Sequence, residues 1–322
     1  MIRLRRENVR RRTGKIDSRW LNGRWQMADG RLPYAISQTL LLLCYLPSPS
    51  AHKPSAMTSS AEREWDADAY HRISDPQFAW GMKVLQRLEL RGGERVLDVG
   101  CGSGRLTAEL RERLSHGTVV AMDLSLNMVV AARATLAERF RDRWHVVNAT
   151  AQTLPFGESF DVVFSTATFH WVTDHAELFR SIYSVLAAGG RLHAQCGGGP
   201  NLAVLHARAH ALKESSRFAR HFGAWRDPWE FADDATTATR LRAAGFSNVA
   251  TSLEHAPTAF PGAATYREFI TKVVVRPYLL HLPDEVLRDR FVSHLTELAE
   301  SDTPPYTLDY WRLNVAANRP EI

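Results

Sequence analysis

One segment of the chain combines an acidic residue with three closely spaced glycines, a composition suited to binding a nucleotide-like ligand. It reads V-L-D-V-G-C-G-S-G-R-L, and its acidic residue and glycines are Asp98, Gly100, Gly102 and Gly104. An apolar run ends just before the glycines and a helical leucine pattern begins after them, so they occupy a strand-to-helix turn. Glycine lets the backbone turn sharply and lets a ligand approach without meeting a Cβ. The alternative interpretation is that these glycines only allow close packing at the turn and bind no ligand.

The spacing of these glycines separates two classes of cofactor. A dinucleotide site has the pattern G-x-G-x-x-G, whereas here Arg105 stands where the third glycine should be. This departure disfavours a nicotinamide oxidoreductase. A second carboxylate, Asp123, ends the next apolar run, where it would lie beside the loop and accept hydrogen bonds from two ribose hydroxyls. Its structural alternative is a helix cap, a role that Ser125 fills equally well.

The pattern from residue 62 onward predicts an α/β fold. Short apolar runs alternate with helical stretches, as in a parallel sheet of right-handed βαβ units. The expected strands are 95–99, 118–123, 145–148, 160–165 and 191–195, and the helical stretches between them are 106–114, 128–140 and 176–186. Further along, the sequence predicts a helix over 237–244, a strand near 249–254, helices within 262–300 and a last strand over 310–316.

Composition and charge exclude several functional classes. The chain has 322 residues, 45% of them hydrophobic and 23% charged, the balance of a globular protein with a full core. Its three distant cysteines indicate neither a disulfide framework nor a zinc site, and they suit a reducing, cytoplasmic setting. Residues 1–56 hold 11 Lys/Arg against 3 Asp/Glu, a net charge of +8. Because the whole chain has a net charge of +5, the remaining residues carry −3. The basic balance therefore gives no support to a nucleic-acid partner.

Residues 1–56 are expected to be a basic, disordered extension. Six arginines near the start repel one another, and the apolar stretch 40–46 is far shorter than the roughly 20 residues that span a bilayer. A nuclear or membrane address is one alternative, and translation that begins at Met57 is another. RNA tethering is disfavoured because no aromatic platform is interleaved with the arginines. The sequence thus predicts neither a membrane nor a nucleic-acid partner.

Several motifs together resemble a class I S-adenosylmethionine-dependent methyltransferase over residues 62 to about 318. They are D-x-G-x-G-x-G from Asp98, Asp123, L-P-F at 154–156, F-D at 160–161 and the double glycine at 189–190. Three segments resemble the small-molecule branch that contains trans-aconitate 2-methyltransferase: W-D-A-D-A-Y at 65–70, F-H-W-V-T-D at 169–174 and R-P-Y-L at 276–279. The resemblance implies a Rossmann-like, seven-stranded, mostly parallel sheet flanked by helices, with a helical cap inserted before the last strand.

The resemblance also divides the chain into parts. A methyltransferase domain would cover 57–322, with an N-terminal helical cover over 57–90, a cofactor-binding half over 91–200 and substrate-cap insertions over 201–236 and 260–308. The implied cofactor is S-adenosylmethionine, and no metal is expected. The oligomeric state is left open, with a monomer as one option.

The same resemblance assigns the cofactor contacts. The expected residues are Asp98, Gly100, Gly102, Gly104, Asp123, Leu124, Thr150, Ala151, Gln152 and Ser165. Asp98 and the glycines would face the methionine portion, Asp123 would hold the ribose, and Ser165 would line the cleft near the sulfonium. Residues 151–152 would lie against adenine. Thr150 stands where many relatives have an acidic residue, so either Thr150 or the backbone would hold the adenine amino group.

The acceptor-binding candidates are aromatic and basic. His170 follows the fourth strand, where this class aims residues at the reacting centre, and its ordinary pKa near 6.5 suits a general base. It could instead pack beside Trp171 and close over the cofactor. Arg276 in the cap could bind a substrate carboxylate through two parallel hydrogen bonds, or lie at the surface at a helix end. Trp171, Tyr70 and Tyr278 are expected to line the same pocket. Trp225, Tyr306, Tyr310 and Arg312 are further candidates, many of which would simply belong to the core.

The sequence therefore predicts a cytoplasmic enzyme that methylates a small molecule, preferentially the carboxylate of a small organic acid. A carboxylate needs no base, whereas a hydroxyl or carbon acid does. The alternative is O- or C-methylation of a phenolic, quinone or polyketide-type metabolite with His170 as base. A cofactor-binding protein without catalysis is the alternative from another class. DNA base methylation is disfavoured because the P-P-Y element at 304–306 does not follow the fourth strand.

Removal of residues 1–56 is expected to leave the folded domain intact. A variant that begins at Met57 should keep the melting temperature and the cofactor affinity of the full chain, because the composition of the removed part cannot support a core. Thermal unfolding and calorimetric titration of both proteins measure this. A truncated protein that unfolds would show instead that the extension is structural.

Overall fold

The structure, a computed structural model, describes residues 18–21, 24–27, 64–67 and 74–321. The chain divides into two compact units, Met1–Lys53 and Pro54–Ile322. In the first unit, β1 (Ser18–Leu21) and β2 (Arg24–Met27) pair as an antiparallel hairpin. The rest of the basic extension and Tyr70 lie outside the described residues, so what was expected of them stays a prediction.

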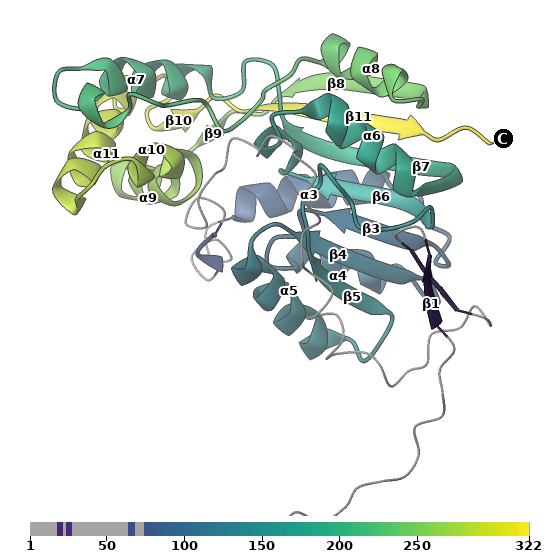
Figure 1. Cartoon of the computed structure of the whole chain (residues 1–322). Coiled ribbons are helices and arrows are strands. Elements are labelled where there is room, and N and C mark those ends of the chain that lie inside the picture. Colours follow the sequence, from purple (N-terminus) through teal and green to yellow (C-terminus); the bar gives the residue numbers. More distant parts are fainter. Residues whose placement is uncertain (1–17, 22–23, 28–63, 68–73, 322) are drawn as a thin grey trace, which may run out of the picture. The chain divides into compact units, whose positions relative to one another are not determined.

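The second unit is built on a seven-stranded sheet (Figure 1). Its strands are β3 (Arg95–Val99), β4 (Thr118–Asp123), β5 (Trp144–Asn148), β6 (Phe160–Thr166), β7 (Leu186–Gly197), β8 (Ser247–His255) and β11 (Trp311–Asn318). The strand order is β5-β4-β3-β6-β7-β11-β8. The five strands β3 to β7 run parallel to one another, and β11 runs antiparallel to both of its neighbours, β7 and β8. The predicted Rossmann-like, mostly parallel sheet is confirmed.

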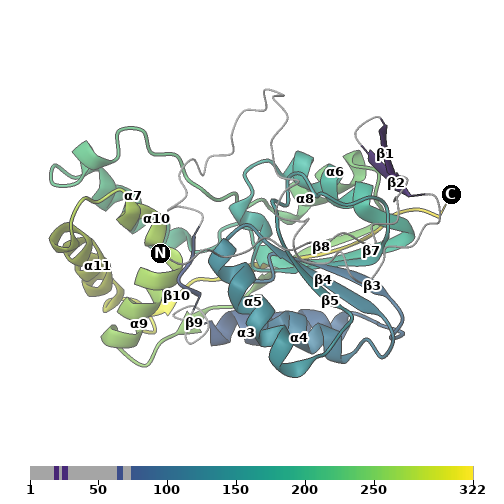
Figure 2. The same ribbon diagram turned by 60° about the horizontal axis from the view of Figure 1, so that its bottom comes forward.

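Helices cover both faces of this sheet (Figure 2). They are α3 (Asp75–Arg87), α4 (Arg105–Glu112), α5 (Leu126–Arg139), α6 (His175–Val185) and α8 (Asp234–Ala243). Val96 of β3 packs with Leu85 of α3, while the next residue, Leu97, packs with Leu178 of α6. Because successive side chains of a strand point to opposite faces, one buried strand supplies both hydrophobic cores.

A cap of short helices is inserted in two parts, one between β7 and α8 and the other between β8 and β11. It comprises α7 (Ala203–Glu214), η2 (Ala219–His221), β9 (Thr258–Ala259), α9 (Ala263–Phe269), the π-helical η3 (Ile270–Val274), α10 (Arg276–Leu280), α11 (Glu285–Ala299) and β10 (Thr307–Leu308). Its own core includes the fully buried rings of Tyr266, Tyr278 and Phe291. The helical insertion expected before the last strand is therefore present. None of the described helices is long and apolar enough to cross a membrane.

Candidate active site

A cavity of about 190 Å³ lies where the parallel strands end, between this edge and the cap. Open α/β sheets bind ligands at the carboxyl ends of their strands. The turns after β3, β4 and β5 contribute seven of the ten expected cofactor residues, namely Gly100, Gly102, Asp123, Leu124, Thr150, Ala151 and Gln152. Another part of the lining, which we call the acceptor end, comes from η1 (Phe169–Trp171), α7, Trp229, Phe231, η3 and the start of β11.

The glycine loop has the conformation that its composition predicts. Gly100 and Gly104 have φ values of +76° and +82°, which side chains rarely tolerate. A Cβ at Gly100 would lie 2.1 Å from Thr168 Oγ1, and one at Gly104 would lie 2.9 Å from the Cα of Ala132. Gly100 lines the cavity and Gly104 does not. Gly104 therefore serves close packing alone, whereas Gly100 both allows close packing and forms part of the cavity wall.

Asp123 ties the glycine loop to the next turn. Its Oδ2 accepts a hydrogen bond from Gly102 N at 3.0 Å, and its Oδ1 accepts one from Ser125 N at 2.9 Å. Burial raises the pKa of this carboxyl, and the backbone donors counteract the shift. Ser125 itself caps α5 by accepting from Met128 N. The cap role thus belongs to Ser125, and the Asp123 carboxylate is held at the cavity.

Asp98 and Ser165 were expected at the cofactor but lie outside the cavity lining. Asp98 is 2% exposed and accepts a hydrogen bond from Thr107 Oγ1 of α4 at 2.6 Å. Burial raises the pKa of Asp98 to about 7. The buried hydroxyl of Ser165 donates to the carbonyl of Val99 at 2.7 Å. Both side chains join elements beneath the loop: Asp98 holds α4 against β3, and Ser165 links β6 to β3.

The turn after β5 is positioned by a residue that sequence reasoning missed. The amide of Asn148 donates to the carbonyls of Asp123 and Leu124, at 3.0 and 2.9 Å. These bonds fix the end of β4 against the end of β5, which presents Thr150 and Gln152 to the same cavity. An asparagine at the end of a predicted strand was the available signal.

His170 is placed at the acceptor end in one defined tautomer. Its Nδ1 accepts a hydrogen bond from Gly197 N at 3.3 Å, so the ring proton resides on Nε2. Burial lowers the pKa of His170 to about 3, and the nearby Arg312 guanidinium adds to the shift. An imidazole of this kind donates a hydrogen bond but accepts protons poorly. His170 and Trp171 both line the cavity, and the rings of these neighbours lie 5.4 Å apart.

Arg276 and Tyr278, expected to bind the substrate, do not line this cavity. The Arg276 guanidinium donates to the carbonyl of Glu64 and lies over the Trp65 ring, with Cζ 5.1 Å from the ring centroid. It lines a separate cavity of about 310 Å³ on the cap. Tyr278 is fully buried and stacks on Trp225 with a centroid distance of 4.5 Å. The structure thus uses Arg276 to hold residues 64–65 against the cap.

Arg312 supplies positive charge to the acceptor end instead. It is 3% exposed, lines the cavity, and donates from Nε to Gln195 Oε1 at 3.3 Å. Its guanidinium lies over the Trp80 ring, 4.5 Å from Cζ to the centroid. The backbone of Arg312 pairs with Gly197, the residue that donates to His170. An arginine within an apolar strand pattern was the sequence signal for this site.

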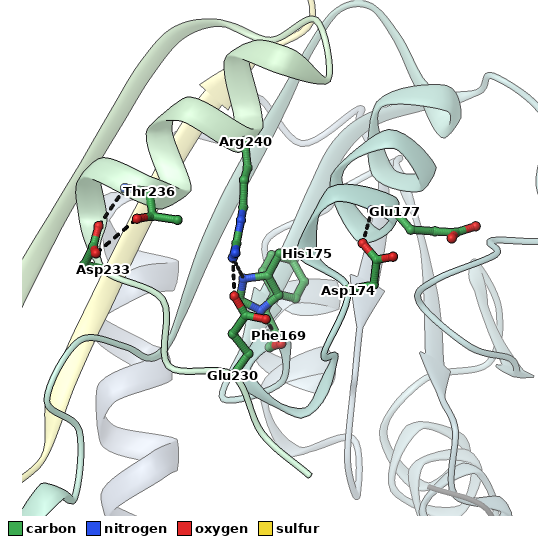
Figure 3. Close-up of polar contacts among 8 residues, drawn as sticks. All are labelled: Phe169, Asp174, His175, Glu177, Glu230, Asp233, Thr236 and Arg240. Carbon is green, nitrogen blue, oxygen red and sulfur yellow. Dashed lines mark hydrogen bonds and ion pairs between the residues drawn. The ribbon is translucent and has the colours of Figure 1, made fainter. Parts of the chain in front are cut away.

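A polar cluster outside the cavity anchors one of its walls (Figure 3). Arg240 of α8 forms an ion pair with Glu230 and donates to His175 Nδ1 at 3.3 Å. His175 Nε2 lies 3.0 Å from the carbonyl of Phe169, and Glu230 N donates to the carbonyl of His170 at 2.8 Å. The cluster therefore connects α8, the start of α6 and the turn that carries His170. Glu230 lies between Trp229 and Phe231, which both line the cavity, so this cluster holds residues 229–231 in place.

Comparisons with known proteins agree with this architecture. A family model described as a methyltransferase domain matches residues 97–194. Trans-aconitate 2-methyltransferase of Deinococcus radiodurans is 26% identical over 80% of this chain and 99% of its own. Malonyl-[acyl-carrier protein] O-methyltransferase of Legionella pneumophila is 33% identical, over 39% of this chain and 45% of its own.

Solved structures share the fold at low identity. The YcgJ protein of Bacillus subtilis has a TM-score of 0.53 and 19% identity, covering 76% of this chain and 99% of its own. Phosphoethanolamine N-methyltransferase 2 of Haemonchus contortus, solved with S-adenosyl-L-methionine, has a TM-score of 0.52 and 19% identity, covering 81% of this chain and 57% of its own. The family match runs from β3 to β7, the strands whose ends form the cavity. The chain belongs to the class I S-adenosylmethionine-dependent methyltransferases.

The cavity of this methyltransferase fits its cofactor. The Asp123 carboxylate, already held by two backbone donors, has acceptor capacity left for ribose hydroxyls. Gly100 lets Thr168 pack directly against the backbone of the loop, and both residues line the cavity. Among the described residues, Gln77 Oε1 lines the cavity as a buried acceptor without a hydrogen-bond partner, which suits an ammonium donor. These residues would hold the ribose and the methionine portion of S-adenosylmethionine.

Loss of the Asp123 carboxylate should weaken cofactor binding. The Asp123→Ala variant removes a charge-assisted acceptor, so we expect S-adenosylmethionine affinity to fall by about 1.5–3 kcal/mol, with no binding of NAD by either protein. Isothermal titration calorimetry measures both ligands. An unchanged affinity for S-adenosylmethionine, or measurable NAD binding, would contradict this assignment.

Asp98 should make the stability of the ligand-free protein depend on pH. Its pKa of about 7 in the folded state exceeds the ordinary value of 3.8, so the folded state binds more protons between these values. Stability therefore falls as pH rises from about 4 to 7. The Asp98→Asn variant removes this penalty and should gain about 4 kcal/mol relative to the parent at pH 8, but little at pH 4. Urea unfolding at both pH values tests this, and a constant difference between the proteins would refute it.

Proposed function

We propose that this methyltransferase transfers its methyl group to the carboxylate of a small organic acid. The observation that carries the proposal is Arg312, the permanently charged cation among the described residues that line the cavity. A guanidinium matches a carboxylate through two parallel hydrogen bonds, and the pairing is strong where water is excluded. Arg312 takes the part that the sequence pattern assigned to Arg276.

The protonation states at the acceptor end favour a substrate that needs no base. The pKa of His170 is about 3, and burial lowers the pKa of the neighbouring His206 to about 4. Both imidazoles are therefore neutral and weakly basic at physiological pH. A carboxylic acid, with an ordinary pKa near 4, arrives ionised, whereas a phenol near 10 would have to lose a proton in the site. The alternative in which His170 deprotonates a hydroxyl or carbon acid lacks support from this geometry.

Each part of the cavity then has a defined task. S-adenosylmethionine, when bound, supplies a methyl group already activated by a positive sulfur. Asp123 would fix the ribose, and Arg312 would bind and orient the acid. Trp171 and Trp229 line the cavity and would make its acceptor end less accessible to water. Because alignment of two bound reactants can be worth about 7–11 kcal/mol, positioning suffices as the main contribution of the protein.

The names of two relatives support an acid acceptor. The Deinococcus radiodurans protein is named for trans-aconitate, and the Legionella pneumophila protein for a malonyl group. Both names contain a carboxylate-bearing acceptor. A small molecule rather than a nucleic acid also agrees with the small volume and the aromatic lining of the cavity.

The rate of acid methylation should be nearly constant from about pH 6 to 9, because neither the acid nor a protein base titrates there. The Arg312→Gln variant should raise the KM for the acid by about 10²-fold through loss of the buried ion pair. S-adenosylhomocysteine release measured over a panel of organic acids provides the rates. Arg312→Lys should recover part of the affinity, since it keeps the charge but not the paired donors.

The matched control is Arg139→Gln, which alters an arginine of α5 that pairs with Glu109 outside the cavity and should leave the KM for the acid unchanged. The affinity of each variant for S-adenosylhomocysteine shows whether its cofactor site is intact. His170→Gln should reduce the rate only modestly. A rate that rises through a pKa near 6–7 and loses that dependence in the His170 variant would contradict the proposal and favour a hydroxyl or carbon acceptor.

A further inference from the structure

We propose that Asn201 is a second acceptor-binding residue, whose side-chain amide donates a hydrogen bond to the same carboxylate group that Arg312 binds. The inference deepens the proposed function and rests on it, because Arg312 holds the acid. Asn201 lies in the turn between β7 and α7 and lines the cavity, as Arg312 does. Its side chain is uncharged, so it adds a directed contact without changing the charge of the site.

The amide of Asn201 has one defined orientation. Its Oδ1 lies 3.0 Å from Trp311 N, and only the oxygen of an amide can accept a hydrogen bond from a backbone N–H. The other terminal atom is therefore Nδ2, which has no hydrogen-bond partner among the residues that the structure describes. Nδ2 is not one of the fully buried atoms that lack a partner, so it keeps a surface that a ligand can reach. The residue as a whole is only 4% exposed, so this N–H is a donor in an otherwise buried side chain.

Nδ2 of Asn201 and the side chain of Arg312 lie on the same face of the sheet. Gly197 of β7 pairs directly with Arg312 of β11. Directly paired residues point their side chains to the same face, with Cβ atoms about 4.5–5.5 Å apart. A Cβ at Gly197 would lie 2.7 Å from Asn201 Nδ2, so Nδ2 occupies the space that a side chain at position 197 would fill. The glycine thus allows a neutral donor to lie beside the cation.

The turn that carries Asn201 is fastened to the strand that carries Arg312. Gly198 N donates to the carbonyl of Trp311 at 3.2 Å, and the N–H of Trp311 donates to Asn201 Oδ1. The guanidinium of Arg312 is held in turn by Gln195. The two donors therefore keep their relative positions before a ligand binds. A site whose donors are already in place loses little conformational freedom on binding.

A neutral donor beside a cation suits a carboxylate that must also react. The two oxygens of a carboxylate offer about four lone pairs, so Asn201 and Arg312 can both donate to the group and leave a lone pair for the reaction. A second cation in place of the amide would bind the acid more strongly, but it would also draw more charge from the oxygen that reacts. Asn201 therefore adds alignment, which is the main contribution of the protein to the transfer.

The test measures binding of three monocarboxylates, benzoate, phenylacetate and hexanoate, to the full chain in the presence of S-adenosylhomocysteine. Each probe carries oxygen only in its single carboxylate, so an effect of Asn201 on its affinity concerns that group. We expect at least one probe to bind and Arg312→Gln to weaken it. Asn201→Ala, which removes the N–H, should weaken the same probe by about 10-fold. Isothermal titration calorimetry gives the dissociation constants.

The Asn201→Asp variant separates donation to the ligand from attachment of the turn. It keeps an oxygen for the N–H of Trp311 but replaces the donor with an anionic oxygen. If Asn201 binds the acid, this variant should be worse than Asn201→Ala, with binding about 100-fold weaker than in the parent, because two anions would face each other. If Asn201 acted only by holding Trp311, Asn201→Asp would be the milder change.

The matched controls are Asn318→Ala and Asn318→Asp. Asn318 is the last residue of β11, at the opposite end of the strand from Arg312, and it does not line the cavity. Both control variants should leave the affinity for the probe unchanged. Melting temperature and S-adenosylhomocysteine affinity confirm that each variant is folded.

The possible outcomes separate the two proposals. Binding that depends on Arg312 would overturn this inference alone if Asn201→Ala leaves it unchanged, if Asn201→Asp is milder than Asn201→Ala, or if Asn318→Asp weakens it equally. If none of the probes binds, or if their binding is the same in Arg312→Gln, the proposed function itself fails. Weaker binding in both Asn201 variants, with the larger loss in Asn201→Asp and none in the controls, would support both.

Discussion

The direction of one strand determines where the charge of the active site lies. Every parallel strand of the sheet ends at the edge that carries the cavity, and side chains there are contributed by carboxyl-terminal turns. Because β11 runs the opposite way, its beginning arrives at that same edge. Arg312, the second residue of β11, is thereby paired with Gly197, the last residue of β7. An all-parallel sheet would have placed the start of its last strand at the far edge.

Burial then sets the chemistry around Arg312. His170 beside it and His206 in the same cavity are neutral because the interior disfavours their charged forms. The same low polarity strengthens any pairing between the guanidinium and an anion. On the opposite side of the cavity, Asp123 is stabilised by backbone donors. The cavity thus separates a positive acceptor end from a negative cofactor end, with aromatic side chains between them.

Most of the residues expected at the cofactor lie at the cavity, whereas two of those expected at the acceptor, Arg276 and Tyr278, do not. Gly100, Asp123 and residues 150–152 follow directly from strands that can be read locally, and parallel strands bring their ends together. Arg276 was misplaced because the partner of its guanidinium is the carbonyl of Glu64, 212 positions earlier, and no local pattern encodes that contact. Asp98 and Ser165 show the same limitation on a smaller scale. Their side chains form hydrogen bonds with Thr107 and with the carbonyl of Val99, contacts that depend on how the helices and strands pack.

The cluster around Glu230 has a consequence for how such an enzyme diversifies. Its side chain and backbone hold the segment from outside the cavity, while the residues on either side of it, Trp229 and Phe231, face the ligand. In residues 229–231, the middle residue therefore anchors the segment and the two flanking residues form the cavity lining. Replacement of the two flanking aromatic residues can change which molecule is accepted without disturbing the anchor, the cofactor half or the charge at Arg312. A directed-evolution library that varies the codons of Trp229 and Phe231 can therefore change part of the cavity lining while the anchor at Glu230 is kept.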